Sequence, residues 1–83
     1  NSSKLVMLVL RRMNLTPEIL KKSFKFSLFI HLEYLDLSEN DIHFIPLKTF
    51  FNNQKLKFLN LKSNKLKIIN FDEFEHLSSI KFD

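Results

Sequence analysis

A single pattern of residues occurs twice in the middle of this chain. Residues 32–40 read LEYLDLSEN, and residues 56–64 read LKFLNLKSN. Each leucine of the first copy, and its asparagine, has an identical partner 24 positions later. The matched pairs are Leu32 with Leu56, Leu35 with Leu59, Leu37 with Leu61, and Asn40 with Asn64. A fixed period of this length predicts a stack of similar coils, in which each coil needs its neighbour to bury its apolar side chains.

The spacing of the leucines predicts a strand followed by a turn. Leu35 and Leu37 are two positions apart, so on a strand they point to one side while Asp36 points to the other. The chain must then leave the sheet, and the amide of Asn40 can donate and accept hydrogen bonds with backbone groups that no longer pair. The sequence therefore predicts short parallel strands side by side, with a ladder formed by Asn40 and Asn64.

A third, less regular copy begins upstream. Residues 5–10 fit the leucine pattern, but 27 positions separate Leu5 from Leu32. The three additional residues fall between positions 16 and 25. The threonine, proline and glutamate at 16–18 form a helix-start arrangement, so a short helix is expected on the return path.

The first copy departs from the pattern at the asparagine. Met13 stands where Asn40 and Asn64 stand in the later copies. Either Asn14 takes over this role through a local shift, or the ladder begins at Asn40. We favour the second alternative, because Leu15 keeps the register of the first copy.

The segments that follow each ladder position predict the rest of the core. Apolar residues continue the core along the return path, and phenylalanines should stack as a spine beneath it. The expected core residues are Ile42, Ile45, Leu66 and Ile69, with Phe50 and Phe74 as the spine. Ile80 lies 24 positions after Leu56 and is expected to open a fourth repeat. The predicted repeats are 5–31, 32–55 and 56–79, with a partial repeat at 80–83.

With these features the sequence resembles the 24-residue, "typical" class of leucine-rich repeats found in Toll-like receptor ectodomains and small leucine-rich proteoglycans. Residues 45–50 (IPLKTF) are similar to the I-P-x-x-x-F return segment of that class. The resemblance implies an α/β solenoid shaped as a horseshoe, with a short parallel sheet on its concave side. It also implies a protein-binding scaffold in an extracellular or receptor-ectodomain setting, such as innate immunity. These 83 residues lack the cysteine-rich end caps of the class.

Composition excludes several kinds of chemistry. The chain contains no cysteine, which removes disulfides and thiolate metal sites, and no glycine, which removes close phosphate-binding loops. His31, His43 and His76 fall at different phases of the repeat, so they are not expected to gather into a metal or catalytic site. We therefore expect no enzyme activity, no cofactor and no small-molecule substrate.

The candidate binding residues are those that point away from the core in each strand. The residue before the second leucine of each copy, with the residues two and four positions on, should line the concave side. These positions are Met7, Tyr34, Phe58 and Phe82, then Val9, Asp36 and Asn60, then Arg11, Ser38 and Lys62. Aromatic and arginine side chains on a rigid surface are typical of interaction hot spots, so we expect a protein partner there. The alternative is that the large residues merely pack laterally over the sheet.

Other functions stay open from the sequence. The net charge of +4 permits binding of an anionic polymer such as nucleic acid or glycosaminoglycan. The segment could also be a structural spacer in a longer array. Asn14 lies in an N-x-T sequon and is the expected glycan acceptor if the protein is secreted. Open ends of the stack would expose apolar surface and strand edges, so self-association is also expected.

Overall fold

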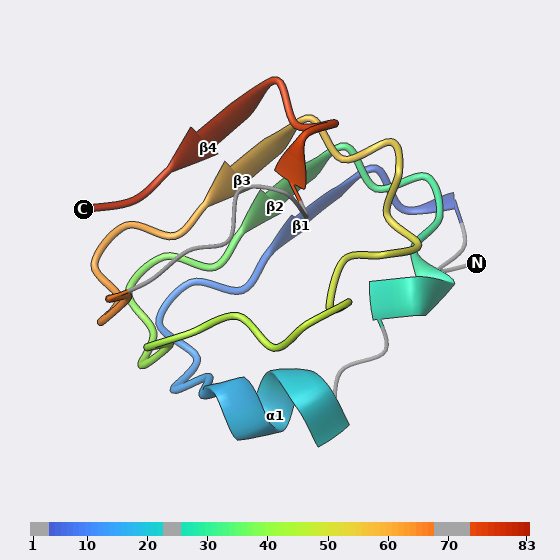
Figure 1. Cartoon of the computed structure of the whole chain (residues 1–83). Helices are drawn as coiled ribbons and strands as arrows, with labels where there is room; N and C mark the ends of the chain where they lie inside the picture. The colour runs from blue at the N-terminus through green and yellow to red at the C-terminus, as the bar shows by residue number, and fades with distance from the viewer. Residues whose placement is uncertain (1–3, 23–25, 68–73) are drawn as a thin grey trace.

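The computed structural model describes residues 4–22, 26–67 and 74–83 of the chain. Within these ranges the elements, in chain order, are β1 (Met7–Val9), α1 (Pro17–Lys22), η2 (Phe26–Leu28), β2 (Tyr34–Asp36), β3 (Phe58–Asn60) and β4 (Ser79–Lys81). The four strands form one parallel sheet in the order β1-β2-β3-β4, and Figure 1 shows α1 on the side of the molecule away from the sheet.

The first three strands pair with the spacing that the sequence predicts. Leu8 lies beside Leu35, 27 positions later, and Leu35 lies beside Leu59, 24 positions later. Neighbouring parallel strands need a crossover between them, so the chain completes one coil for each repeat. The prediction of a short parallel sheet built from stacked repeats is confirmed over these strands.

The fourth strand corrects the predicted register. The 24-residue period aligns Ile80 with Leu56, but Ile80 pairs with Leu59, which is 21 positions before it. Leu77 therefore takes the place of Leu56, and Phe82 takes the place of an inward leucine. The predicted register of Ile80 is therefore wrong, and the spacing Leu77-x-x-Ile80-x-Phe82 fits the leucine pattern in the observed register.

The leucines of the strands and the start of the return path form the core. The predicted inward leucines are all buried, namely Leu35, Leu37, Leu59 and Leu61. Ile42 is also buried, and Ile45 and Leu66 are half-buried and pack against the same cluster. Ile69, the remaining core residue that the sequence predicts, lies outside the described residues.

Three phenylalanines, one from each repeat, run beneath the core. Phe26, Phe50 and Phe74 are all buried. The ring centroids of Phe26 and Phe50 lie 5.4 Å apart, and those of Phe50 and Phe74 lie 6.0 Å apart, with tilted planes. Edge and tilted contacts of this kind are favourable for aromatic rings. The predicted contact between Phe50 and Phe74 is confirmed, although the rings are tilted rather than face to face.

A buried asparagine that the sequence analysis did not single out also fixes the return path. Asn53 is fully buried, and its Nδ2 atom donates hydrogen bonds to the carbonyl oxygens of Phe26 at 2.8 Å and Phe29 at 3.1 Å. The His76 ring also contacts this residue, with its Nε2 atom 3.1 Å from the backbone carbonyl oxygen of Asn53. The sequence feature that could have identified Asn53 is its position, 24 residues after the apolar Phe29, where a polar amide side chain is unexpected.

The additional residues of the first repeat form the short helix that the sequence predicts. The Thr16 hydroxyl oxygen accepts a hydrogen bond from the Ile19 amide at 3.3 Å, which caps the helix, and Pro17 occupies the first helical position. Leu20 is buried and joins α1 to the core. None of the helices in the described ranges is long and apolar enough to span a membrane.

The Asn40 side chain links the first repeat to the second. Its Nδ2 atom donates hydrogen bonds to the carbonyl oxygens of Leu10 and Leu37, each at 2.9 Å. Its Oδ1 atom accepts hydrogen bonds from the amides of Met13 and Leu15, also at 2.9 Å. These bonds satisfy backbone groups at the point where the chain leaves the sheet, which confirms the predicted role of Asn40.

Asn64 makes the equivalent link between the second and third repeats. Its Nδ2 atom donates to the Leu37 carbonyl oxygen at 2.9 Å, and its Oδ1 atom accepts from the Ile42 amide at 3.0 Å. Asn14, by contrast, is exposed and has a left-handed backbone with φ of 56°. The ladder therefore begins at Asn40, as the favoured alternative predicts.

Candidate interaction surface

The outer face of the sheet is the face opposite the buried leucines. Successive residues of a strand point to opposite sides, so the two residues that flank each central leucine or isoleucine face outward. Strand pairing arranges them in two rows across the sheet. The first row is Met7, Tyr34, Phe58 and Ser79, and the second row is Val9, Asp36, Asn60 and Lys81.

An aromatic stack lies at the centre of the first row. The rings of Tyr34 and Phe58 are 4.5 Å apart and within 5° of parallel, and both side chains are half-buried. The Lys81 ammonium lies 5.4 Å from the centre of the Phe58 ring, within the range of a cation–π contact. Met7 continues the row and is 58% exposed. The face thus holds rings that neighbouring strands fix in place.

Two polar residues of the second row end their strands. The Asp36 carboxylate accepts a hydrogen bond from the Ser38 amide at 2.9 Å, and the Asn60 side-chain oxygen accepts one from the Lys62 amide at 3.0 Å. Short polar side chains commonly form such turns with the amide two positions on. Asp36 and Asn60 therefore have a structural role in addition to their place on the outer face.

Two predicted site residues do not lie where the sequence analysis places them. Ser38 is 6% exposed, because the turn after β2 folds it inward, so it adds little to the surface. Phe82 is not the fourth member of the first row, because the register of β4 gives that place to Ser79. The remaining predicted residues of the strands lie in the two outward rows, namely Met7, Val9, Tyr34, Asp36, Phe58 and Asn60. Arg11 and Lys62 lie in the turns that follow β1 and β3 and are exposed.

Several basic side chains around the sheet are neutralised by acidic neighbours. Glu39 contacts both Arg11 and Arg12, with 2.7 Å between Arg12 Nη2 and Glu39 Oε1. The hydrogen bond from Arg12, followed by that from Arg11, lowers the pKa of the Glu39 carboxyl, and the same contact raises the pKa of Arg12. Glu39 therefore partly neutralises both Arg11 and Arg12.

Four lysines near β3 and β4 differ in whether they form a salt bridge. Lys57 lies 3.1 Å from the Glu33 carboxylate, and Lys65 lies 3.0 Å from that of Asp41. Lys62 and Lys81, in contrast, form no salt bridge with any residue of the described ranges. Among the described residues, positive charge on the outer face that forms no salt bridge therefore lies at its β4 end, on Lys81.

The histidines lie apart from one another. His31 Nδ1 is 3.2 Å from the Lys55 ammonium, His43 packs edge-on against the Phe44 ring, and His76 contacts the return path. No group of three or more histidine, aspartate or glutamate side chains within residues 4–22, 26–67 and 74–83 could hold a metal ion.

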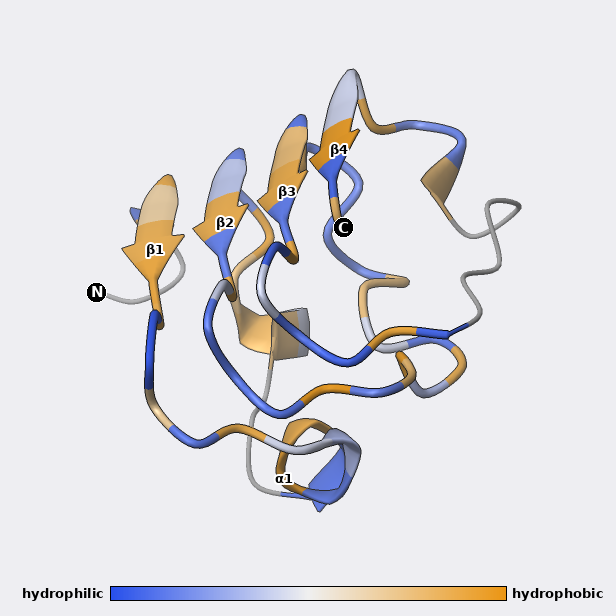
Figure 2. Cartoon of the chain, turned by 90° about the vertical axis from the view of Figure 1, so that its left-hand side faces the viewer, coloured by the Kyte–Doolittle hydropathy of each residue, from blue (hydrophilic) through white to orange (hydrophobic). Residues whose placement is uncertain are grey.

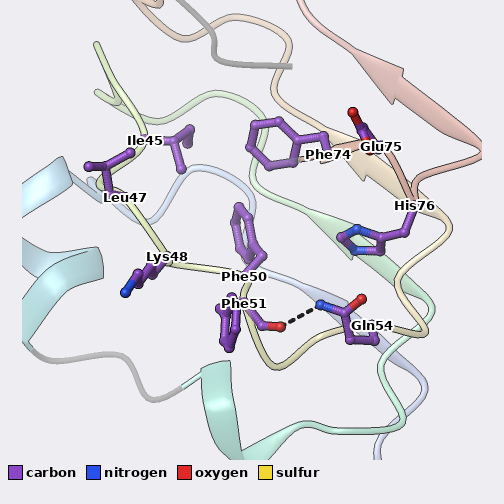
Figure 3. Close-up of a pocket in the computed structure, with 9 residues that line it drawn as sticks. All are labelled: Ile45, Leu47, Lys48, Phe50, Phe51, Gln54, Phe74, Glu75 and His76. Atoms are coloured by element: carbon purple, nitrogen blue, oxygen red, sulfur yellow. Dashed lines mark hydrogen bonds between the residues drawn. The ribbon is translucent and has the colours of Figure 1, made fainter. Parts of the chain in front are cut away.

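A cavity of about 500 Å³ lies at the return path, away from the outer face of the sheet. Figure 3 shows its lining, which is mostly apolar and includes the rings of Phe50, Phe51 and Phe74. Two of its polar side chains already have partners in the protein. Gln54 donates a hydrogen bond to the Phe51 carbonyl oxygen at 2.6 Å, and the His76 ring contacts a backbone carbonyl. These contacts favour a packing role for the lining.

A comparison with protein families agrees with this geometry. A family model described as "Leucine rich repeat" matches residues 30–82, a range that includes β2, β3, β4 and both ladder asparagines. A search of curated proteins and a search of solved structures give no match. The first repeat lies mostly before the matched range, yet β1 pairs with β2 in the same register and Asn40 joins the two repeats. The match covers more than half of the chain, which therefore belongs to the leucine-rich repeat family.

Proposed function

We propose that this chain is a non-catalytic recognition segment that binds a protein through the outer face of its sheet. Leucine-rich repeat domains generally mediate protein–protein interactions. The observation that supports this face most strongly is the stack of Tyr34 and Phe58, with Met7 exposed beside it. Aromatic side chains at the centre of an interface commonly carry most of the binding energy.

The stacked rings also favour binding for an entropic reason. Ordering a free side chain at an interface costs about 0.5–1.5 kcal/mol. Tyr34 and Phe58 are already held face to face by neighbouring strands, so a partner that covers them has little more to order. The alternative that large residues merely cover the sheet does not account for the exposure of Met7 and Val9, which are 58% and 53% accessible.

Selection from a phage-displayed random-peptide library tests this function. The chain is the bait, and enriched peptides are tested for binding to a variant with Tyr34→Ala and Phe58→Ala. A variant with Leu47→Ser and Phe51→Ser removes two large, exposed apolar side chains at the return path and serves as the matched control. The proposal predicts that enriched peptides lose binding to the first variant and retain it to the control. Peptides that bind both variants equally would move the site away from the outer face.

One observation favours a second function, the binding of an anionic polymer. The stacked aromatic rings, with the Lys81 ammonium 5.4 Å from the centre of the Phe58 ring and Lys62 exposed in the turn after β3, have the composition of a stacking platform for single-stranded nucleic acid. Salt dependence separates the two functions, because each phosphate contact to a single strand contributes a slope of about −0.7 in log affinity against log salt. Fluorescence anisotropy with single-stranded DNA and with heparin should show weak binding if the partner is a protein.

The setting of the protein is a further part of this proposal. We propose that the chain is a section of a horseshoe-shaped solenoid in an extracellular or receptor ectodomain. Asn14 supports this, since it lies in a sequon and is exposed just beyond the first strand. Expression through a mammalian secretory pathway tests it. Because residues 1–3 (NSS) form a second sequon, glycosidase treatment should lower the mass of the wild type by more than that of Asn14→Gln. Equal losses of mass, or an unmodified secreted chain, would contradict glycosylation at Asn14.

A further inference from the structure

We infer that the partner contributes an extended stretch of polypeptide which crosses the strands and places an apolar side chain over β1 and a carboxylate over β4. This inference rests on the proposed function and specifies the chemistry of the partner. It follows from three properties of the outer face, namely the order of its side chains, the distribution of its unpaired charge, and the distance between its two ends.

The side chains of the outer face change in character from one edge of the sheet to the other. Figure 2 shows β1 hydrophobic along its whole length, whereas β4 ends in a hydrophilic residue. Met7 and Val9 supply the apolar end, and Tyr34 and Phe58 supply the aromatic centre. Lys81 closes the second row at the other end. A ligand that matches this face must carry its apolar and charged groups in the same order.

The positive charge at the β4 end is available to a partner. Lys81 is exposed and forms no salt bridge within the described part of the chain, while Lys57 is already paired with Glu33. The Asp83 carboxylate, close to Lys81 in sequence, accepts a hydrogen bond from the Ser63 amide at 2.8 Å. The contact with the Phe58 ring holds the Lys81 ammonium at the border of the aromatic stack. A carboxylate placed there would meet a cation that is already positioned.

Asp36 is the acidic residue on this face that could oppose such a carboxylate. It lies in the same row as Lys81 but two strands away, which corresponds to about 10 Å. Physiological salt screens most of the repulsion between exposed charges at that distance. Its carboxylate also already accepts the Ser38 amide. Asp36 therefore favours a hydrogen-bond donor at the middle of the partner segment. The acidic side chain of the partner is expected at the β4 end.

The width of the sheet sets the spacing within the partner. Neighbouring strands are about 4.8 Å apart, so β1 and β4 are separated by about 14 Å. An extended polypeptide rises about 3.3 Å per residue, so two side chains four positions apart span nearly this distance and point to the same side. The expected partner motif is therefore an apolar residue and an acidic residue at positions i and i+4, in either order, with a residue between them that covers the aromatic stack.

The charge at the β4 end is tested by repeating the peptide selection on a variant with Lys81→Glu. The wild type should enrich peptides with Asp or Glu four positions from an apolar residue, and the variant should enrich Lys or Arg at that same position. Lys21→Glu makes an equal charge change on α1, on the far side of the molecule, and should leave the selected motif unchanged. Thermal melts of both variants establish that each is folded.

Synthetic peptides give the quantitative form of this test. Replacing the selected carboxylate by its amide should weaken binding to the wild type by about two- to fivefold, the range of an exposed ion pair. The same replacement should have no effect on binding to Lys81→Gln. Peptides that need Tyr34 and Phe58 but show no acidic preference, or whose preference is unchanged by Lys81→Glu, would overturn the inference and leave the proposed function intact. Peptides that ignore the aromatic pair would overturn both.

Discussion

Replacing Asn40 by alanine removes the side chain that joins the first repeat to the second. Of the backbone groups that it bonds, the Leu37 carbonyl keeps a hydrogen bond from Asn64. The Leu15 amide and the Leu10 carbonyl lose their bonds to this side chain at part-buried sites. At about 1–1.5 kcal/mol for each stranded group, the variant should be about 2–3 kcal/mol less stable than the wild type.

Urea denaturation followed by circular dichroism measures this loss. With a slope of about 1 kcal/mol per molar urea, as for a small domain, the midpoint should fall by about 2–3 M. Asn14→Gly is the matched control, because Asn14 is exposed and glycine accepts its left-handed backbone. The control should stay within about 0.5 kcal/mol of the wild type. Equal destabilisation of the two variants would refute the assigned register of the first repeat.

Three further predictions concern the stability and assembly of the chain. Ser63→Gly should stabilise it by about 0.5–1 kcal/mol in the same urea assay, because Ser63 has a φ of 57° that glycine adopts freely; a loss of stability would contradict this. Arg12 and Arg11 lower the pKa of Glu39 in the folded state. The stability that these contacts contribute is therefore present above the pKa that Glu39 has in the unfolded chain, and it is lost as pH falls through the lower pKa of the folded state. The melting temperature of Glu39→Gln should therefore approach that of the wild type as pH falls below 4.5, and a widening gap would refute this origin. Sedimentation should show mass rising with concentration, because β1 is an edge strand flanked by the exposed Val6, and Val6→Lys should reduce the association; a strictly monomeric wild type would argue against open ends.

Much of the fold could be predicted from the sequence because each repeat imposes the same physical demands. Inward leucines two positions apart require a strand, and the crossover that follows requires an amide such as Asn40 to satisfy the backbone. Thr16 before Pro17 predicts the start of α1, which the capping bond to Thr16 confirms. The stack of Tyr34 and Phe58 follows from two aromatic residues at matching strand positions.

The register of β4 could not be predicted because two frames satisfy the same pattern. The frame with a period of 24 aligns Phe74 with Phe50, and these rings are indeed in contact. The Leu77 amide, however, donates to the Phe74 carbonyl oxygen, as the Leu56 amide donates to that of Asn53. The backbone of Phe74 thus takes the place of Asn53, while its ring joins the spine. The periodicity of apolar residues does not distinguish the 24-residue alignment from the 21-residue alignment, because Phe74 is buried in either one.

The burial of Ser38 illustrates a second limit of pattern reasoning. Strand alternation predicts that Ser38 faces outward, in line with Tyr34 and Asp36. The strand ends at Asp36, however, whose carboxylate accepts the Ser38 amide and turns the chain inward. The sequence feature that indicates this turn is Asp36, because an aspartate side chain commonly accepts a hydrogen bond from the amide two positions later. Alternation therefore predicts the outer face only as far as the strand extends.

The proposed recognition through the outer face depends above all on Tyr34 and Phe58. The most direct measurement is the dissociation constant of the best enriched peptide for the wild type and for the variant with Tyr34→Ala and Phe58→Ala. Loss of even one hot-spot side chain should weaken binding by about 30-fold, so the double change should weaken it at least that much. The melting temperature should fall by only about 5 °C if roughly 1 kcal/mol of packing is lost, since both side chains lie outside the core. An affinity that stays within about threefold would contradict a binding role for the aromatic pair. A variant that no longer folds would contradict the placement of both side chains outside the core.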